Sequence, residues 1–274
     1  MGTKIQSDQL PTLGYLCNGR LTLETGVPVS TSDQADKTTL YFTPYMGDLI
    51  YIYDGTSWVL YSFAELSLNI SAFTASKPYD IFIYDNAGTL TLEGLVWTDA
   101  TTRATALTTQ NGIYVLTGAT EKRYLGTIYM DAASKCQDSL VKRFVWNYYN
   151  RSPKLLYTVE NTAHFYNGAY RLWNNSSTNN LLNFIIGVLE IPEYMGGGCL
   201  HYAGADDYSS NIALYLNGTI TIVKGVNSNK YYIGSLQSVF LYPIMGYNTM
   251  QMYQYSDHAS SRFAEMKMLA TIQG

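Results

Sequence analysis

The sequence predicts an all-β fold made of two sandwich-like (jelly-roll-like) modules that assemble into an oligomer. Runs of β-branched and aromatic residues recur about every 8–12 residues, a spacing typical of sandwiches and barrels. Turn signals such as Asp-Gly and Asn-Gly separate several of these runs, and such turns connect antiparallel strands. The 274 residues suffice for one large sandwich or two smaller β modules.

Three segments carry the pattern of a β-hairpin. Residues 49–61 place two β-branched and aromatic runs around Asp54-Gly55, and residues 79–92 repeat this arrangement. Residues 211–223 alternate apolar and polar side chains around Asn217-Gly218. Asn-Gly between alternating hydrophobic residues is one of the strongest short-range hairpin signals.

The remaining elements follow from periodicity and composition. Residues 181–191 are apolar, and their glycine and β-branched residues favour a buried strand over a helix. Residues 263–272 alternate with a period of two, which predicts a terminal strand. Residues 135–141 are a candidate for a short helical turn, and the glycine run 196–198 is expected to form a flexible turn.

A module boundary is expected near residue 150. Pro153 has no backbone N–H and interrupts a strand ladder, and a dense aromatic run ends just before it. The first half is rich in Thr and Leu, whereas the second is rich in Asn, Tyr and Met. We therefore expect one module over residues 1–150 and another over residues 151–274.

The chain is poorly charged for a folded protein. Charged residues make up 14% of it, against about 25% in typical soluble domains. Thr, Ser, Asn and 26 tyrosines must therefore cover much of its surface, as in subunits of large β assemblies. The 17 Lys and Arg residues are scattered and the net charge is −4, which argues against nucleic acid as a partner.

Membrane insertion and disulfide bonding are not expected either. No run approaches the roughly 18 apolar residues of a membrane-spanning helix, and the N-terminus lacks the apolar core of a signal peptide. Synthesis in a reducing cytoplasm is the expectation. The three widely spaced cysteines, Cys17, Cys136 and Cys199, are then expected to be small buried hydrophobic residues.

Segments along most of the chain resemble landmarks of a widespread family of phage and prophage virion proteins. The matching segments are GRLTL at 19–23, GVPV at 26–29, TLYFTPY at 39–45, residues 50–58, YDIFIYD at 79–85, WTDATTRATAL at 97–107, RYLGT at 123–127, KRFVWNYYNR at 142–151, YRLWNN at 170–175 and GYNTMQ at 246–251.

The resemblance implies a place in the virion and synthesis in the cytoplasm of a bacterial host. Members of the family occur as tail-fibre, head-fibre or capsid-decoration-like proteins, and many are uncharacterised. Other virion proteins of the capsid or tail would then be the partners. No catalytic residues are carried over from the family.

Motifs that would indicate catalysis, a cofactor or a metal are weak. The three histidines fall in no hydrolase or metalloprotease motif. Cys199 and His201 would share one face of a strand, but no second pair of ligands completes a zinc site. Asp206-Asp207 is expected to be a solvated turn, with a weak calcium site or an acid–base pair as alternatives. We therefore expect no enzyme, no cofactor and no metal.

Aromatic, methionine and arginine side chains are the candidates for contact with partners. They serve contacts between subunits or with the capsid, glycan stacking, or packing inside a domain, and packing is the favoured interpretation for Trp146 and Trp173. Near the C-terminus, the tyrosines and methionines predict a soft apolar surface. The full set is Trp146, Tyr148, Tyr149, Tyr170, Arg171, Trp173, Tyr247, Met250, Met252, Tyr253 and Tyr255.

The predicted function is that of a phage virion structural protein, a capsid decoration or fibre subunit that acts by binding. A homotrimer is expected, because uncharged sheet edges favour assembly and most homo-oligomers are closed and symmetric. The alternative is a tail receptor-binding protein that recognises a host surface glycan.

Overall fold

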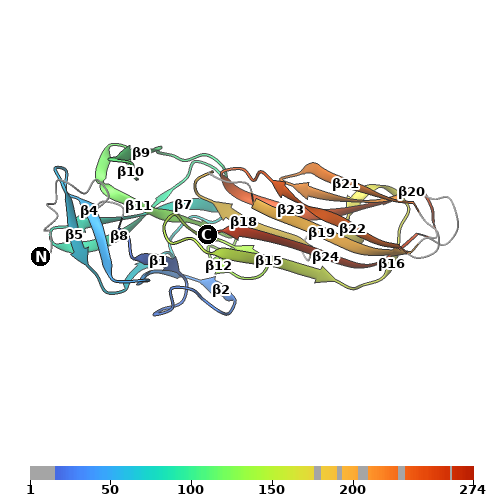
Figure 1. The fold of residues 1–274 in the computed structure, drawn as a ribbon, viewed down its shortest axis with the longest axis horizontal. Coiled ribbons are helices and arrows are strands. Elements are labelled where there is room, and N and C mark those ends of the chain that lie inside the picture. The colour runs from blue at the N-terminus through green and yellow to red at the C-terminus, as the bar shows by residue number, and fades with distance from the viewer. Residues whose placement is uncertain (1–15, 176–179, 190–192, 203–208, 228–231, 260) are drawn as a thin grey trace, which may run out of the picture. The chain divides into compact units, whose positions relative to one another are not determined.

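The computed structural model describes residues 16–175, 180–189, 193–202, 209–227, 232–259 and 261–274. Strands account for nearly all of the regular structure in these ranges (Figure 1). A single turn of 3₁₀-helix, η3 (Trp173–Asn175), is the only helical element described. The predicted all-β fold is therefore confirmed. Among the helices of the described part, none has the length and apolarity needed to cross a membrane.

The chain divides into two compact units. Unit 1 comprises residues Met1–Asp138 and Phe144–Arg151, and unit 2 comprises Ser139–Arg143 and Ser152–Gly274. The last change of unit falls between residues 151 and 152, one residue after the expected boundary. The five residues 139–143 also belong to unit 2, and a single boundary in the sequence does not anticipate this.

Unit 1 is built from small antiparallel sheets. One has the order β1-β3-β6, a second has the order β8-β7-β11-β10-β9 with β14 on β11, and β4 pairs with β5 and β2 with β12. Its strands are β1 (Gly19–Thr22), β2 (Gln34–Lys37), β3 (Thr39–Pro44), β4 (Leu49–Tyr53), β5 (Trp58–Ser62), β6 (Leu66–Asn69), β7 (Lys77–Asn86), β8 (Thr89–Val96), β9 (Leu107–Gln110), β10 (Ile113–Leu116), β11 (Ala119–Met130), β12 (Cys136–Asp138) and β14 (Val145–Asn147).

The core of unit 1 surrounds β7 and β11, which are buried on both faces over most of their length. A buried ion pair lies in this core. Arg103 Nε donates to Asp80 Oδ2 at 2.6 Å, and Thr127 Oγ1 donates to Asp80 Oδ1 at 2.7 Å. The Arg103 guanidinium also lies over the Trp97 ring, 4.5 Å from its centroid. Asp80 is 2% exposed, so its charge depends on these partners.

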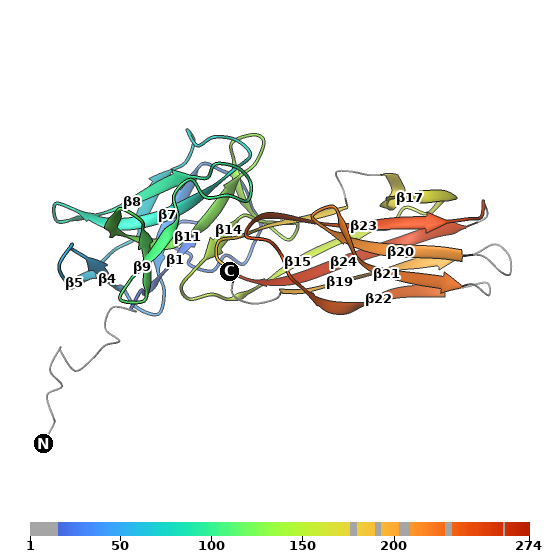
Figure 2. The same cartoon turned by 90° about the horizontal axis from the view of Figure 1, so that it is seen from above.

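Unit 2 is a sandwich of two antiparallel sheets, apart from one parallel pair. One sheet has the order β13-β18-β23-β20-β21 with β17 on β23, and β13 runs parallel to β18. The other has the order β15-β24-β19-β22 with β16 on β24 (Figure 2). The strands are β13 (Lys142–Arg143), β15 (Pro153–Glu160), β16 (His164–Phe165), β17 (Gly168–Leu172), β18 (Leu181–Ile186), β19 (Glu193–Tyr202), β20 (Ser209–Leu216), β21 (Thr219–Asn227), β22 (Tyr232–Leu241), β23 (Gly246–Ser256) and β24 (Arg262–Gln273).

Segment 139–143 connects the two sheets of unit 2. Asn183 N, on β18, donates to Val141 O at 2.9 Å, and Tyr157 N, on β15, donates to Leu140 O at 2.7 Å. The Arg143 guanidinium donates to Leu155 O at 2.8 and 3.0 Å. These bonds occupy backbone groups at the edge of β15, and this explains why the five residues belong to unit 2.

The three predicted hairpins are confirmed as β4–β5, β7–β8 and β20–β21. In the third, Leu216 pairs with Thr219 and the turn residues Asn217 and Gly218 have φ of 53° and 77°. Positive φ at both turn positions is what a type I′ hairpin requires. The buried strand expected from residue 181 and the terminal strand are confirmed as β18 and β24.

Two local predictions are wrong. Residues 135–141 form no helical turn, because Cys136–Asp138 is strand β12 and pairs with β2. The glycine run 196–198 forms no flexible turn, because it lies within β19, between β24 and β22. In both cases hydrogen bonds to distant strands override the local preference.

The buried ion pair generates a prediction about stability. Asp80→Ala leaves the Arg103 charge buried without its carboxylate, so we expect a loss of roughly 3–5 kcal/mol in the free energy of unfolding. Urea denaturation followed by tryptophan fluorescence measures it. The exposed Glu121→Ala serves as the control and is expected to change stability by less than about 0.5 kcal/mol. Equal stability of the two variants would contradict the prediction.

Candidate binding surface

The aromatic segment around Trp146 packs inside unit 1. Trp146 is 1% exposed, and the Arg151 guanidinium lies 4.7 Å from its ring centroid. Asn147 Oδ1 accepts from Leu21 N at 2.6 Å, and Asn147 Nδ2 donates to Leu21 O at 3.1 Å. The ring and the amide that suggested partner contact are thus used to hold β14 against β1. The structure agrees with the packing interpretation of Trp146, because the side chain is buried within unit 1.

Tyr148 and Tyr149 belong to the same cluster but remain half-buried. Their rings meet edge to face at 4.9 Å, and the Arg123 guanidinium lies 4.6 Å from the Tyr149 centroid. Burial raises the pKa of Tyr149, although the nearby Arg123 charge opposes this. Tyr149 therefore helps to enclose Arg123, and Tyr148 packs near Arg151, whose guanidinium lies 5.1 Å from its ring centroid.

Trp173 also packs inside its unit. It is fully buried, and its ring lies edge to face with His164 at 5.5 Å and with Phe263 at 5.4 Å. Its indole Nε1 donates to Glu160 Oε2 at 3.1 Å, and Asn174 Nδ2 donates to the same oxygen at 3.1 Å. The packing interpretation of Trp173 is therefore correct as well.

The predicted soft surface near the C-terminus is divided between two faces of β23. Met250 and Met252 are fully buried, whereas Tyr247, Tyr253 and Tyr255 are half-buried. Successive side chains of a strand point to opposite faces, so the methionines fill the sandwich core and the tyrosines lie outside it. The prediction of a mixed methionine–tyrosine surface is wrong for this reason.

Four half-buried tyrosines from three strands gather on the outer side of β17, β23 and β20. Tyr253 stacks on Tyr215 with ring centroids 3.7 Å apart and 20° between planes, and Tyr255 lies against Tyr170 at 5.2 Å. We call Tyr170, Tyr215, Tyr253 and Tyr255 the tyrosine face. The small side chain of Ala213, opposite Tyr253 in the ladder, leaves room for the diagonal contact between Tyr253 and Tyr215.

The tyrosine face has uncharged neighbours on β23. Burial raises the pKa of Tyr215, and the neighbouring Tyr253 and Tyr170 add to the shift. The outward side chains of β23 are those of Tyr247, Thr249, Gln251, Tyr253 and Tyr255, none of which carries a charge at neutral pH. Such a face loses little hydration when it is covered.

Two predicted residues lie apart from the tyrosine face. Tyr247 is held by its own contact, because its hydroxyl donates to Asn183 Oδ1 at 2.9 Å. Arg171 follows Tyr170 directly and therefore points to the other side of β17. Its guanidinium lies 3.7 Å from the Tyr166 ring centroid.

Tyr215 belongs to the tyrosine face but was not among the predicted residues. It lies in the predicted hairpin 211–223, where Ile212, Leu214 and Leu216 form the apolar set. Because successive side chains of a strand point to opposite faces, Tyr215 is expected to point away from the face of these apolar residues. The alternation in the sequence could therefore have identified it.

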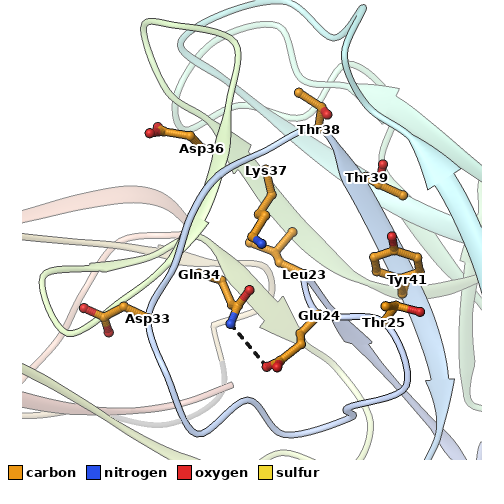
Figure 3. Close-up of a pocket in the computed structure, with 10 residues that line it drawn as sticks. All are labelled: Leu23, Glu24, Thr25, Asp33, Gln34, Asp36, Lys37, Thr38, Thr39 and Tyr41. Atoms are coloured by element: carbon orange, nitrogen blue, oxygen red, sulfur yellow. Dashed lines mark hydrogen bonds between the residues drawn. The ribbon is translucent and has the colours of Figure 1, made fainter.

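A polar cavity of about 540 Å³ lies in unit 1, between the turn after β1, strand β2 and the start of β3 (Figure 3). No motif in the sequence predicts this cavity. Its lining residues are Leu23, Glu24, Thr25, Asp33, Gln34, Asp36, Lys37, Thr38, Thr39 and Tyr41.

Other candidates for chemistry give no site within the described residues. No group of three or more His, Cys, Asp or Glu side chains there is placed to hold a metal ion. Cys17 and Cys136 are buried, as predicted, and burial raises the pKa of Cys17 to about 11. Asp206 and Asp207 lie outside the described residues.

Comparisons with known proteins establish no family. No family model and no curated protein matches the chain. Similar solved structures include the insecticidal delta-endotoxin Cry8Ea1 from Bacillus thuringiensis, at 7% identity and a TM-score of 0.26, over 97% of this chain and 55% of that one. Another is a structure of the Gx strain of infectious bursal disease virus, at 9% identity and a TM-score of 0.32. That match covers 90% of this chain and 74% of the viral one. The chain thus spans about half the length of the endotoxin, and these scores support no argument about function.

The buried Trp173 cluster generates a prediction about pH. Partial burial alone would raise the pKa of Glu160, but hydrogen bonds from Thr162, Asn174 and Trp173 hold it below its usual value of 4.5. The ionised carboxylate therefore stabilises unit 2 above about pH 4.5, and this contribution is lost as the pH falls through the lowered pKa.

Glu160→Gln removes this titration. The variant is expected to unfold at a lower temperature than the wild type at pH 7, with the difference shrinking by pH 3. Circular dichroism melts at the two pH values measure it. A difference in melting temperature that stays constant with pH would show that the carboxylate charge plays no part.

Proposed function

We propose that this chain is a structural protein of a bacteriophage virion, a capsid decoration or fibre subunit that acts by binding. The tyrosine face of unit 2 is the surface that contacts another virion protein. The virion context rests on the resemblance of the sequence to phage and prophage virion proteins. The stacked, uncharged tyrosines on a rigid sheet are the observation that carries the binding role.

Tyrosine suits a protein interface for physical reasons. Its ring contributes a large apolar area and has few rotatable bonds, so little conformational entropy is lost on binding. Contact between Tyr215 and Tyr253 and between Tyr170 and Tyr255 reduces that loss further, because each ring already restricts its neighbour. Tyrosine is also enriched among residues that dominate binding energy.

A protein partner suits this face better than a glycan. A sugar stacks on the open face of an aromatic ring, and Tyr215 and Tyr253 each cover one face of the other. Recognition of a host glycan by a tail receptor-binding protein remains the rival function. Retention of glycans by the wild type and its loss on replacing the tyrosine face would favour that rival.

We further propose that the chain assembles as a homotrimer on the particle. Leu155 and Val159 are exposed on the outer side of β15, where a second copy could cover them. Native mass spectrometry of the purified chain tests the assembly state. A monomer at micromolar concentration would overturn this part of the proposal.

Location on the particle tests the virion role directly. Particles of the phage that encodes the chain are separated into intact virions, heads without tails, and free tails, and each fraction is probed with an antibody. We expect the chain in one particle fraction and none free in the lysate. Its absence from every particle fraction would refute the proposal.

The double substitution Tyr215→Ala and Tyr253→Ala tests the surface. Loss of two central aromatic residues is expected to weaken binding to the particle fraction by at least about thirtyfold. The matched control is Tyr84→Ala, a half-buried tyrosine of β7 in unit 1 that belongs to neither proposed contact surface. Co-sedimentation against increasing concentrations of chain measures the affinity. Equal binding by the double variant and the control would assign the contact to another surface.

A further inference from the structure

The cavity of unit 1 exists because β2 leaves the sheet of its sequence neighbours. Strands β1 and β3 pair with each other, whereas β2, which lies between them in the sequence, pairs with β12. The turn after β1 and the strand β2 therefore diverge from β3. The space between them is lined from both sides by polar side chains (Figure 3).

The wall around Glu24 is held in place by hydrogen bonds. Gln34 is buried, and its amide Nε2 donates to Glu24 Oε2 at 3.2 Å and to Ser32 Oγ at 3.2 Å. In the same turn as Glu24, Thr25 Oγ1 and Gly26 N each donate to the Glu65 carboxylate at 2.6 Å. The cavity thus has fixed walls before any ligand enters, which lowers the entropy cost of binding.

Lys37 and Asp36 contribute the charges nearest the opening. Figure 3 shows the Lys37 side chain pointing toward Leu23 and the Gln34 amide. Asp36 precedes it with a φ of 54°, a left-handed conformation that Asp tolerates better than most residues do. This conformation interrupts the regular strand, so Asp36 and Lys37 depart from simple alternation.

The chemistry of the lining excludes several ligand classes. Three carboxylates against one ammonium disfavour an anion such as a phosphate or an acidic sugar. The apolar contribution is confined to Leu23 and the Tyr41 ring, too little for a lipid. No group of three metal-ligating side chains lies among the described residues, so the lining offers no site for a metal ion.

We propose that this cavity binds a short neutral saccharide. The saccharide hydroxyl groups can donate to the Glu24 carboxylate and can accept from the Lys37 ammonium and the threonine hydroxyls. The Asp33 and Asp36 carboxylates, by contrast, point away from this space (Figure 3). The Tyr41 ring offers an apolar surface for a sugar C–H face. The volume of about 540 Å³ lies within the roughly 300–1,000 Å³ typical of small-molecule sites. This site is separate from the tyrosine face and independent of the proposed virion role.

A glycan array that carries neutral, amino-bearing and acidic oligosaccharides identifies the ligand with the purified full chain. Isothermal titration calorimetry then measures the best neutral ligand. We expect Lys37→Met to weaken binding at least about tenfold, because it removes charge-assisted hydrogen bonds. Glu24→Gln should also weaken binding, because it removes the carboxylate that accepts from the sugar hydroxyls.

Two controls make the result specific to the cavity. Lys135→Met removes a lysine of unit 1 that does not line the cavity, and the Tyr215→Ala, Tyr253→Ala double variant alters only the tyrosine face. Both should bind the saccharide as the wild type does. Circular dichroism melts confirm that each variant is folded. Failure of the array to retain any neutral glycan, or unchanged binding by folded Lys37→Met and Glu24→Gln, would overturn the proposal.

Discussion

The alternation of side chains along β23 determines both the core and the surface of unit 2. Met250 and Met252 point into the sandwich, and Tyr253 and Tyr255 point out of it. The pairing with β20 and β18 fixes which residues lie beside them. A shift of one residue in this register would expose the methionines and bury the tyrosines. The binding surface and the stability of the unit therefore depend on the same ladder of hydrogen bonds.

Local sequence signals predicted those parts of the fold that local interactions determine. The turn Asn217-Gly218 has the two positive φ values that its hairpin needs, and β24 shows the expected period of two. The predictions were wrong where pairing with strands distant in the sequence determines the local structure. Gly196–Gly198 has low strand propensity, yet β24 and β22 supply partners on both sides of it. Residues 136–138 form a strand because they pair with β2, which lies far earlier in the sequence.

Composition alone could not separate packing from recognition at the candidate site. Trp146 and Trp173 are large aromatic residues beside amides, as are many interface residues, but their polar neighbours bond to Leu21 and Glu160 within each unit. Alternation along the strand would have placed Met250 and Tyr253 on opposite faces, because both lie in one regular strand. The cavity of unit 1 had no such signal. It depends on β2 pairing with β12, about a hundred residues later in the chain.

The low charge of the chain has a consequence for its surface, because several of its few charges lie inside unit 1. Arg20 and Arg123 are 1% and 0% exposed, and Arg123 Nη1 donates to the carbonyl oxygens of Leu16 and Tyr51. Asp80 and Arg103 form a further buried pair. The surface therefore carries fewer charged groups than the 17 Lys and Arg and 21 Asp and Glu residues of the sequence suggest. Removing water from charged groups is a large cost of forming an interface. A partner that covers this surface has to desolvate few of them. A protein with this distribution of charge is suited to extensive contact with an uncharged partner, and that physical property supports a binding role independently of any sequence resemblance.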